Sequence, residues 1–188
     1  MYQLVGKRIL DLVVGISALS LLSPLILVIA VLIRIFDPGP VLFRQERVGV
    51  DGRLFLFYKF RSMPVDTEIV PSEQLDNINR TWVGKVIRRT SLDELPQLFN
   101  IIRGDMSIVG PRPSIPSQVN LIDYRRKNGA LQCRPGLTGL AQVNSYDGMT
   151  TAEKARFDVR YAKNISLVSD VKIILSTFFY LLKPPPVY

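Results

Sequence analysis

Apolar residues are concentrated near the N-terminus of the chain. Residues 12–33 form a run of 22 positions without a charge, and about 20 apolar residues are enough for a helix to cross a bilayer. The run is too long for a cleavable signal peptide, and no small-residue cleavage site closes it. The pattern therefore predicts a membrane helix that either spans the bilayer or enters one leaflet and returns.

Two signals favour the return. Ser23 and Pro24 stand in the middle of the run, where proline removes a helical hydrogen bond and clashes with the preceding turn. Lys7 and Arg8 precede the run and Arg34 follows it, and basic flanks favour the cytoplasmic side. We therefore expect a helix–break–helix hairpin in which Ser23 bonds a freed carbonyl, each half reaching about 15–20 Å. A single spanning helix remains the alternative on these grounds alone.

Beyond residue 36 the pattern changes to short elements separated by turns. Strands are predicted over 41–43 and 53–60 around a turn at 49–52, with another over 141–143, and loops over 64–79, 110–113 and 135–139. Helices are predicted over 82–89, 95–102, 118–128, 151–162 and 165–182. The pattern predicts an α+β fold, mainly helical, with a membrane hairpin over 1–36 and a compact domain with a small β element over 37–188.

Composition removes several classes of chemistry. Among 188 residues the single cysteine, Cys133, excludes an internal disulfide, and we expect it to be a small buried hydrophobe. The absence of histidine excludes His-based triads and the usual catalytic zinc sites, so that a metal would sit on carboxylates, which points to Mg²⁺. The net charge of +8 indicates an anionic partner.

The densest polar chemistry lies around Asp93 and Glu94. Ser91 and Glu94 have the spacing of a capping box, whereas Asp93 as the N-cap would tolerate Pro96 better. Either arrangement puts Asp93 at a helix N-terminus, which favours a carboxylate or a phosphate. Asp93 is therefore a candidate nucleophile, and Glu94 a candidate ligand for Mg²⁺ against a diphosphate.

Basic residues surround this pair in the sequence. Arg112 lies between two prolines that fix its backbone, and a preorganised guanidinium suits bidentate phosphate binding. Lys59 and Arg88 are either phosphate ligands or solvated surface charges. Asp158 and Asp170 fall on predicted helices, and Asp170 is unusual because its helix is otherwise apolar. No Walker-type phosphate loop is present in the sequence.

Several ordered blocks along nearly the whole chain resemble one family. They comprise Lys7-Arg8-x-x-Asp11, the Ser23-Pro24 pair, and residues 39–47, 58–63, 91–100, 104–113, 134–139 and 141–144. The chain resembles the bacterial sugar transferases, the small monotopic phosphoglycosyl transferases that begin membrane-linked glycan assembly.

The resemblance implies a two-step reaction at the cytoplasmic leaflet of the bacterial inner membrane. Asp93 would attack the sugar-linked phosphorus of a nucleotide-diphosphate sugar, and the phosphosugar would then move to polyprenol (undecaprenyl) phosphate. Glu94, with Asp93, would hold Mg²⁺; Arg112 would bind phosphate, helped by Lys59 and Arg88. It also implies a re-entrant helix broken at Ser23-Pro24.

Other features are less defined by the resemblance. Arg8 is expected at the lipid headgroups, and Gln142, Asp158 and Asp170 are further site candidates. Many family members have Gly-Arg where this chain has Ser145-Tyr-Asp, so this chain lacks the family's arginine at that place. We expect the minimal catalytic unit, with phospholipids but no nucleic acid as partners; a homo-oligomer is compatible with the sequence. The last helix would lie in the membrane interface or in the core.

Two rival functions follow from the residues themselves. A binding module for anionic lipid or nucleic acid fits the net charge, but residues 41–115 mix 11 basic with 9 acidic residues, which is poor for an electrostatic stripe. A hydrolase could use the carboxylates of Asp93 and Glu94. However, adjacent residues on one helical turn do not face each other across a bond.

Overall fold

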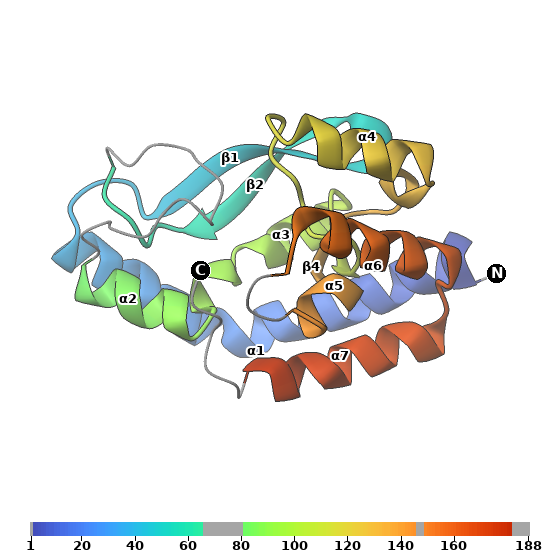
Figure 1. The fold of residues 1–188 in the computed structure, drawn as a ribbon. Coiled ribbons are helices and arrows are strands. Elements are labelled where there is room, and N and C mark those ends of the chain that lie inside the picture. Colours follow the sequence, from blue (N-terminus) through green and yellow to red (C-terminus); the bar gives the residue numbers. More distant parts are fainter. Residues whose placement is uncertain (1, 66–80, 146–148, 182–188) are drawn as a thin grey trace.

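The computed structural model describes residues 2–65, 81–145 and 149–181, so most of the predicted loop 64–79 and Tyr146 and Asp147 lie outside the described residues. The fold is mostly helical with two small sheets, as predicted (Figure 1). The elements are α1 Lys7–Phe36, β1 Leu42–Val48, β2 Leu54–Phe60, α2 Trp82–Arg89, α3 Gln97–Arg103, β3 Ser107–Val109, α4 Val119–Lys127, β4 Gly136–Thr138, α5 Leu140–Val143, α6 Thr151–Lys163 and α7 Leu167–Leu181.

The N-terminal helix is one continuous element that includes Pro24. The expected break is therefore wrong as an interruption of the helix, although the ribbon of α1 changes direction near its middle (Figure 1). Pro24 has no N–H to give to the carbonyl oxygen of Ser20. The Ser23 hydroxyl donates to that oxygen at 2.9 Å, as predicted, and this substitute bond allows the helix to continue.

Both halves of α1 pack on the same globular part. Val14 and Ala18 of the first half pack against a core that contains Leu98 and Ile101. Ile29 and Ile33 of the second half are buried in a second core, formed with residues Phe60, Val83 and Ile87. Among the described residues α1 is the one helix long and apolar enough to cross a membrane, and much of its surface is unburied.

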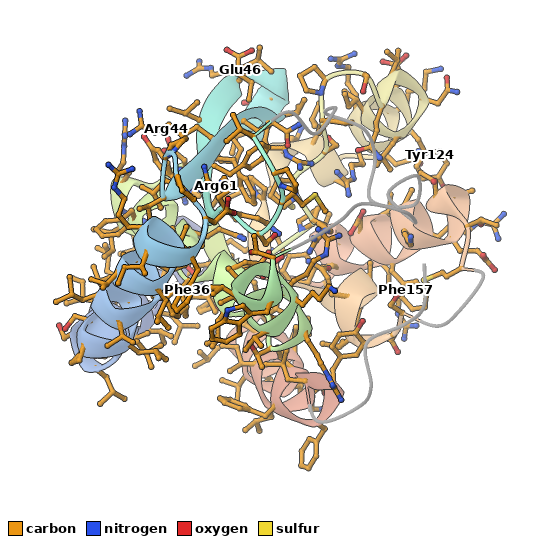
Figure 2. All side chains as sticks on the ribbon, turned by 90° about the vertical axis from the view of Figure 1, so that its left-hand side faces the viewer. Phe36, Arg44, Glu46, Arg61, Tyr124 and Phe157 are labelled. Atoms are coloured by element: carbon orange, nitrogen blue, oxygen red, sulfur yellow. The ribbon has the colours of Figure 1, made fainter. Side chains whose placement is uncertain are left out.

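The predicted strand pair is an antiparallel hairpin, with a first strand longer than predicted. Its register runs from Leu42 opposite Phe60 to Val48 opposite Leu54, and Asp51 takes a left-handed φ of 54° in the connection. Figure 2 shows the end of the hairpin near Arg61 beside the end of α1. There Arg61 forms an ion pair with Asp37, which ties the C-terminal end of α1 to the sheet.

The second sheet was not predicted, and its strand β4 lies within the predicted loop 135–139. Strands β3 and β4 pair in parallel, with Ser107 opposite Gly136 and Val109 opposite Thr138. A Cβ on Gly136 would lie 2.1 Å from the Gly110 nitrogen. The close approach of these two backbone segments therefore requires glycine at position 136. The predicted strand over 141–143 is wrong because that segment forms the short helix α5 after Gly139.

The C-terminal helices were predicted nearly at their observed bounds. Thr150 and Glu153 form a capping box at the start of α6. On α7 only Asp170 and Ile173 are buried, whereas Leu175, Phe178 and Phe179 are exposed. The alternative that α7 is a buried core helix is therefore wrong, and its outer face is apolar and uncovered.

Candidate active site

Asp93 and Glu94 lie on a single 3₁₀ turn, Leu92–Glu94, just before α3. Neither predicted cap is observed: Ser91 is left-handed with φ 56° and makes no capping bond, and Pro96 occupies the N-cap position of α3. The reason is the rigid φ of Pro96, which suits the start of a helix but not its interior. Asp93 therefore lies on the turn before α3 and not at the N-terminus of that helix, where the pattern placed it.

Lys59 and Arg112 bring positive charge to the two carboxylates. Lys59 extends from β2 and donates to Glu94 Oε1 at 2.7 Å, while its Nζ lies 3.6 Å from Asp93 Oδ2. Arg112 lies in the loop after β3 and donates to the same Glu94 oxygen at 3.3 Å. The side chain of Arg112 is 53% exposed and that of Asp93 only 7%. The cluster therefore joins a buried carboxylate to a guanidinium that faces solvent.

The two neighbouring carboxyl groups differ in their ease of ionisation. Burial raises the pKa of Asp93, and the charge of Lys59 works in the opposite direction. Burial also opposes ionisation of Glu94, but the charges and hydrogen bonds of Lys59 and Arg112 outweigh it and lower its pKa to about 2. The result is a Glu94 anion held in place by two cations beside Asp93, whose carboxyl group is the more basic of the two.

Two further arginines belong to this region. Arg88 of α2 is close enough to lower the pKa of Asp93, and its Nη1 lies 3.8 Å from the sulfur of Met63. Arg47 of β1 was not predicted. Its guanidinium lies 5.2 Å from the Phe57 ring centroid, and burial together with the charge of Arg112 lowers its pKa to about 10.

The other predicted residues lie apart from this cluster. Asp170 is fully buried and accepts bonds from Lys7 and Tyr161, each at 2.8 Å. Asp158 pairs with Arg125 at 2.6 Å. Sequence reasoning missed Arg125, although it follows Leu121 by one helical turn on the buried face of α4.

Gln142, Arg8 and Cys133 occupy distinct surroundings. The amide atoms of Gln142 are buried on α5 and have no hydrogen-bond partner among the described residues. Arg8 donates from Nη1 and Nη2 to the carbonyls of Ile101 and Ile102, each at 2.6 Å, and so binds the C-terminal end of α3. Its contact with lipid headgroups stays a prediction. Cys133 is a free, partly buried thiol, and burial raises its pKa to about 11.

The donor set around Asp93 fits Mg²⁺ bound together with substrate. Within residues 2–65, 81–145 and 149–181, no group of three or more metal-ligating side chains lies together, so these residues do not form an all-protein cage. Mg²⁺ is ordinarily held by one or two carboxylates plus substrate phosphates and water. Asp93 and Glu94 supply such a pair of carboxylates, and Arg112 stands beside them for phosphate.

Comparison with known proteins assigns the family. The model for "Bacterial sugar transferase" matches residues 2–184. The chain belongs to this family. The bacterial sugar transferase is 43% identical over 189 residues to the UDP-glucose:undecaprenyl-phosphate glucose-1-phosphate transferase of Klebsiella pneumoniae, covering 94% of this chain and 40% of that protein.

Two other relatives extend the comparison. The UDP-N-acetylgalactosamine-undecaprenyl-phosphate N-acetylgalactosaminephosphotransferase of Aeromonas hydrophila is 43% identical, over 91% of this chain and 42% of its own length. The exopolysaccharide production protein ExoY of Sinorhizobium fredii is 38% identical, over 92% of this chain and 84% of its own length. This bacterial sugar transferase thus spans less than half of the first two relatives and most of the third.

Proposed function

We propose that this chain transfers a sugar 1-phosphate from a UDP-sugar to undecaprenyl phosphate. The activities for which the Klebsiella and Aeromonas relatives are named support this reaction class. The observation that carries the chemical assignment is the cluster in which Lys59 and Arg112 hold Glu94 beside Asp93. Such a cluster suits a dianionic diphosphate donor and a carboxylate nucleophile.

In the first proposed step an oxygen of Asp93 attacks the sugar-linked phosphorus. A new P–O bond forms to the carboxylate, and the bond from that phosphorus to the bridging oxygen breaks, so that UMP leaves with the bonding electron pair. Arg112 binds and orients the diphosphate, with Lys59 and Arg88 adding positive charge near the developing negative charge. Mg²⁺ held by Asp93 and Glu94 would supply further neutralisation of the diphosphate.

In the second proposed step a phosphate oxygen of undecaprenyl phosphate attacks the same phosphorus. The acyl phosphate bond breaks, Asp93 returns as a carboxylate, and the product is an undecaprenyl diphosphate sugar. Because the donor is soluble and the acceptor is a lipid, the reaction requires a site at the membrane surface. The exposed apolar faces of α1 and α7 supply a surface of that kind.

We infer that α1 enters only the cytoplasmic leaflet. Asp11 in its first half accepts hydrogen bonds from Ser107 and from the Ile108 main chain. Ile33 in its second half packs with Val83 in one core. A single span would place one of these contacts on the far side of the bilayer. Cysteines at positions 3 and 40, in a Cys133→Ala background, should both react only from the cytoplasm; reaction of position 3 from outside would restore a span.

The reaction is tested by UMP release with a panel of UDP-glucose, UDP-galactose and UDP-N-acetylgalactosamine, with undecaprenyl phosphate and Mg²⁺. We expect turnover with at least one donor and a loss of about 10³-fold or more after Asp93→Asn. No turnover with any donor would favour the binding module considered above. Free sugar or sugar phosphate as the main product would instead support a hydrolase.

A further inference from the structure

The loop that carries Arg112 is held through its main-chain carbonyl oxygens. Pro111 and Pro113 have no N–H to donate, so carbonyls offer the main anchoring points on this stretch. Four consecutive carbonyls each accept a bond from a different donor: Pro111 from Gly136 N at 2.8 Å, Arg112 from Arg125 Nη1 at 3.0 Å, Pro113 from Arg47 Nη1 at 3.1 Å and Ser114 from Val48 N at 2.9 Å. Two of the four donors are guanidinium groups.

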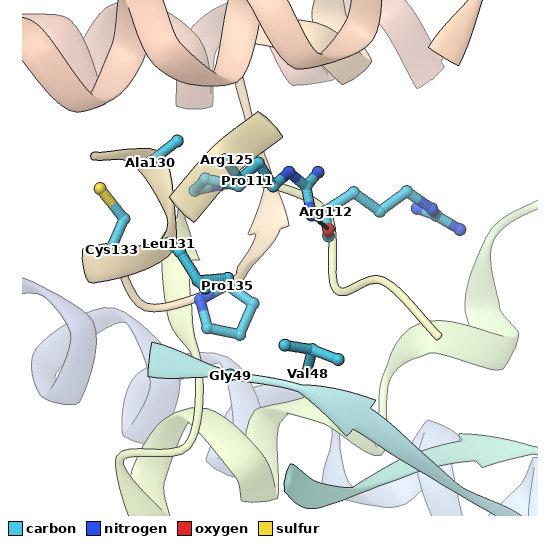
Figure 3. A pocket seen from close by; sticks show the side chains of 9 residues that line it. All are labelled: Val48, Gly49, Pro111, Arg112, Arg125, Ala130, Leu131, Cys133 and Pro135. Carbon is cyan, nitrogen blue, oxygen red and sulfur yellow. Dashed lines mark hydrogen bonds between the residues drawn. The ribbon is translucent and has the colours of Figure 1, made fainter. Parts of the chain in front are cut away.

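The guanidinium that reaches Arg112 is itself fixed by a buried carboxylate. Arg125 comes from α4 and is 5% exposed, and Asp158 comes from α6 and is 2% exposed. Nε and Nη2 of Arg125 both donate to Asp158 Oδ2, at 3.0 and 2.6 Å. Because the guanidinium is planar and rigid, these two bonds set the direction of Nη1. Figure 3 shows that Nη1 meets the Arg112 carbonyl at the wall of a small pocket behind the loop.

The anchored backbone determines where the Arg112 side chain begins. That side chain reaches out of the loop to Glu94 Oε1 at 3.3 Å and is otherwise half exposed. A displacement of about 1 Å at a site can cost about 10²-fold in rate. A pair that fixes the main chain of Arg112 therefore acts on the reaction without touching substrate.

We propose that Arg125 and Asp158 form a positioning pair for Arg112, which rests on the proposed role of Arg112 in binding the donor diphosphate. Asp158 compensates the buried charge of Arg125 and fixes the orientation of its guanidinium group. In that orientation Arg125 donates a hydrogen bond to the Arg112 carbonyl oxygen. Helices α4 and α6 are in this way coupled to the phosphate-binding loop. This assigns a role to Asp158, which lies apart from the Asp93 cluster.

The first test replaces Arg125 by lysine, which keeps the charge but cannot bond Asp158 with two donors and Arg112 with a third. We expect Arg125→Lys to lower kcat/KM for the UDP-sugar by about tenfold or more. Arg126→Lys is the matched control, because Arg126 is the next residue on α4 and its side chain is exposed. Among the described residues it forms an ion pair with Asp123. The control should stay within twofold of the wild type.

A double-mutant cycle with Arg112→Ala separates positioning from general destabilisation. If Arg125 acts through Arg112, Arg125→Lys should cost less than twofold once the Arg112 guanidinium is gone. An equal loss in both backgrounds would overturn the proposal, as would unchanged kcat/KM in the single variant. If Arg125→Lys does not fold, as judged by its unfolding midpoint, Asp158→Asn takes its place in the same cycle.

The same cycle is also read on the Kd for UDP, which requires no turnover. A wild-type chain that releases no UMP from any donor contradicts the proposed function. The cycle read on the Kd for UDP still tests whether Arg125 and Asp158 position Arg112. There we expect Arg125→Lys to weaken UDP binding when Arg112 is present and to leave it unchanged in Arg112→Ala. Equal changes in both backgrounds would reject the positioning role.

Discussion

Carboxylates occupy two kinds of surroundings in this molecule. Asp170 is fully buried and accepts bonds from Lys7, Tyr161 and Tyr2, all supplied by the protein. Asp93 is buried too, but Lys59 lies 3.6 Å away and is shared with Glu94. The side chain of Lys7 is 10% exposed, whereas that of Arg112 is 53% exposed.

The difference separates a carboxylate with its own buried cation from one that shares its cation with a neighbouring carboxylate. The carboxylate of Asp170 is saturated by close donors, and it joins α7 to the start of α1. In the Asp93 cluster Lys59 and Arg112 both bond Glu94, so the negative charge of Asp93 is kept at a higher energetic cost. The side chain of Arg112 also reaches the surface, where a phosphate can bind. Burial alone therefore does not indicate function; the distribution of the partners does.

Asp93→Asn should produce the largest effect on activity. The amide is a poor nucleophile, so we expect kcat to fall by about 10³-fold or more, within the range seen for loss of a nucleophile. The free energy of unfolding should not decrease, because the raised pKa of Asp93 marks a carboxylate that is costly to bury. UMP release and chemical unfolding measure the two quantities; near-full activity would rule out Asp93 as nucleophile.

Asp170→Asn should have the reverse profile. Removing this charge leaves Lys7 buried without its partner, and we expect a loss of about 3–5 kcal/mol in the free energy of unfolding. Asp123→Asn, which breaks the exposed pair with Arg126, should change it by less than about 1 kcal/mol. Thermal or denaturant unfolding in detergent micelles compares them, and equal effects would remove the distinction between the two regions.

Arg112→Lys should lower activity without loss of stability. A lysine retains the charge but not the two-pronged geometry that suits a diphosphate, so we expect kcat/KM to fall by about 10–100-fold. Steady-state kinetics with the accepted UDP-sugar gives this ratio. A change within twofold would mean that Arg112 contributes charge alone.

The smallest expected effect is a shift in pH dependence. Activity should fall as the pH decreases through the raised pKa of Asp93, whereas Glu94, with a pKa of about 2, stays ionised. Lys59→Met removes the cation that lowers the pKa of Asp93, and Arg88, Arg112 and Glu94 remain around it. The acidic limb of kcat/KM against pH should therefore move to higher pH. A shift to lower pH would mean that another group controls the limb.

The sequence indicated most elements because their local signals were strong. The hairpin strands contain apolar runs around a turn marked by Gly49 and Gly52, and Gly104 ends α3 in a left-handed conformation. Strand β4 was missed because it is three residues long and exists through pairing with β3, which is a tertiary contact. The continuity of α1 through Pro24 was missed because a local rule about proline cannot weigh packing on both halves of the helix.

In the candidate site, too, the residues with strong local signals were predicted and a residue defined by a tertiary contact was missed. Asp93, Glu94 and Arg112 were predicted because each stands in a rigid or helix-initiating context, and the structure brings them together with Lys59. Arg125 was missed because it opens a run of three basic residues that reads as a solvated surface. Its partner Asp158 lies 33 positions away, and a pairing over that distance is set by the packing of α4 on α6.

The central claim is a covalent phosphosugar on Asp93, and it is tested most directly by mass spectrometry of peptides from the full-length chain. The protein is mixed with Mg²⁺ and the accepted UDP-sugar without undecaprenyl phosphate, then quenched in acid and digested. The account predicts one sugar-phosphate adduct per chain on the peptide containing Asp93, together with an equal amount of UMP. No adduct, with UMP formed only after undecaprenyl phosphate is added, would contradict it and indicate direct transfer.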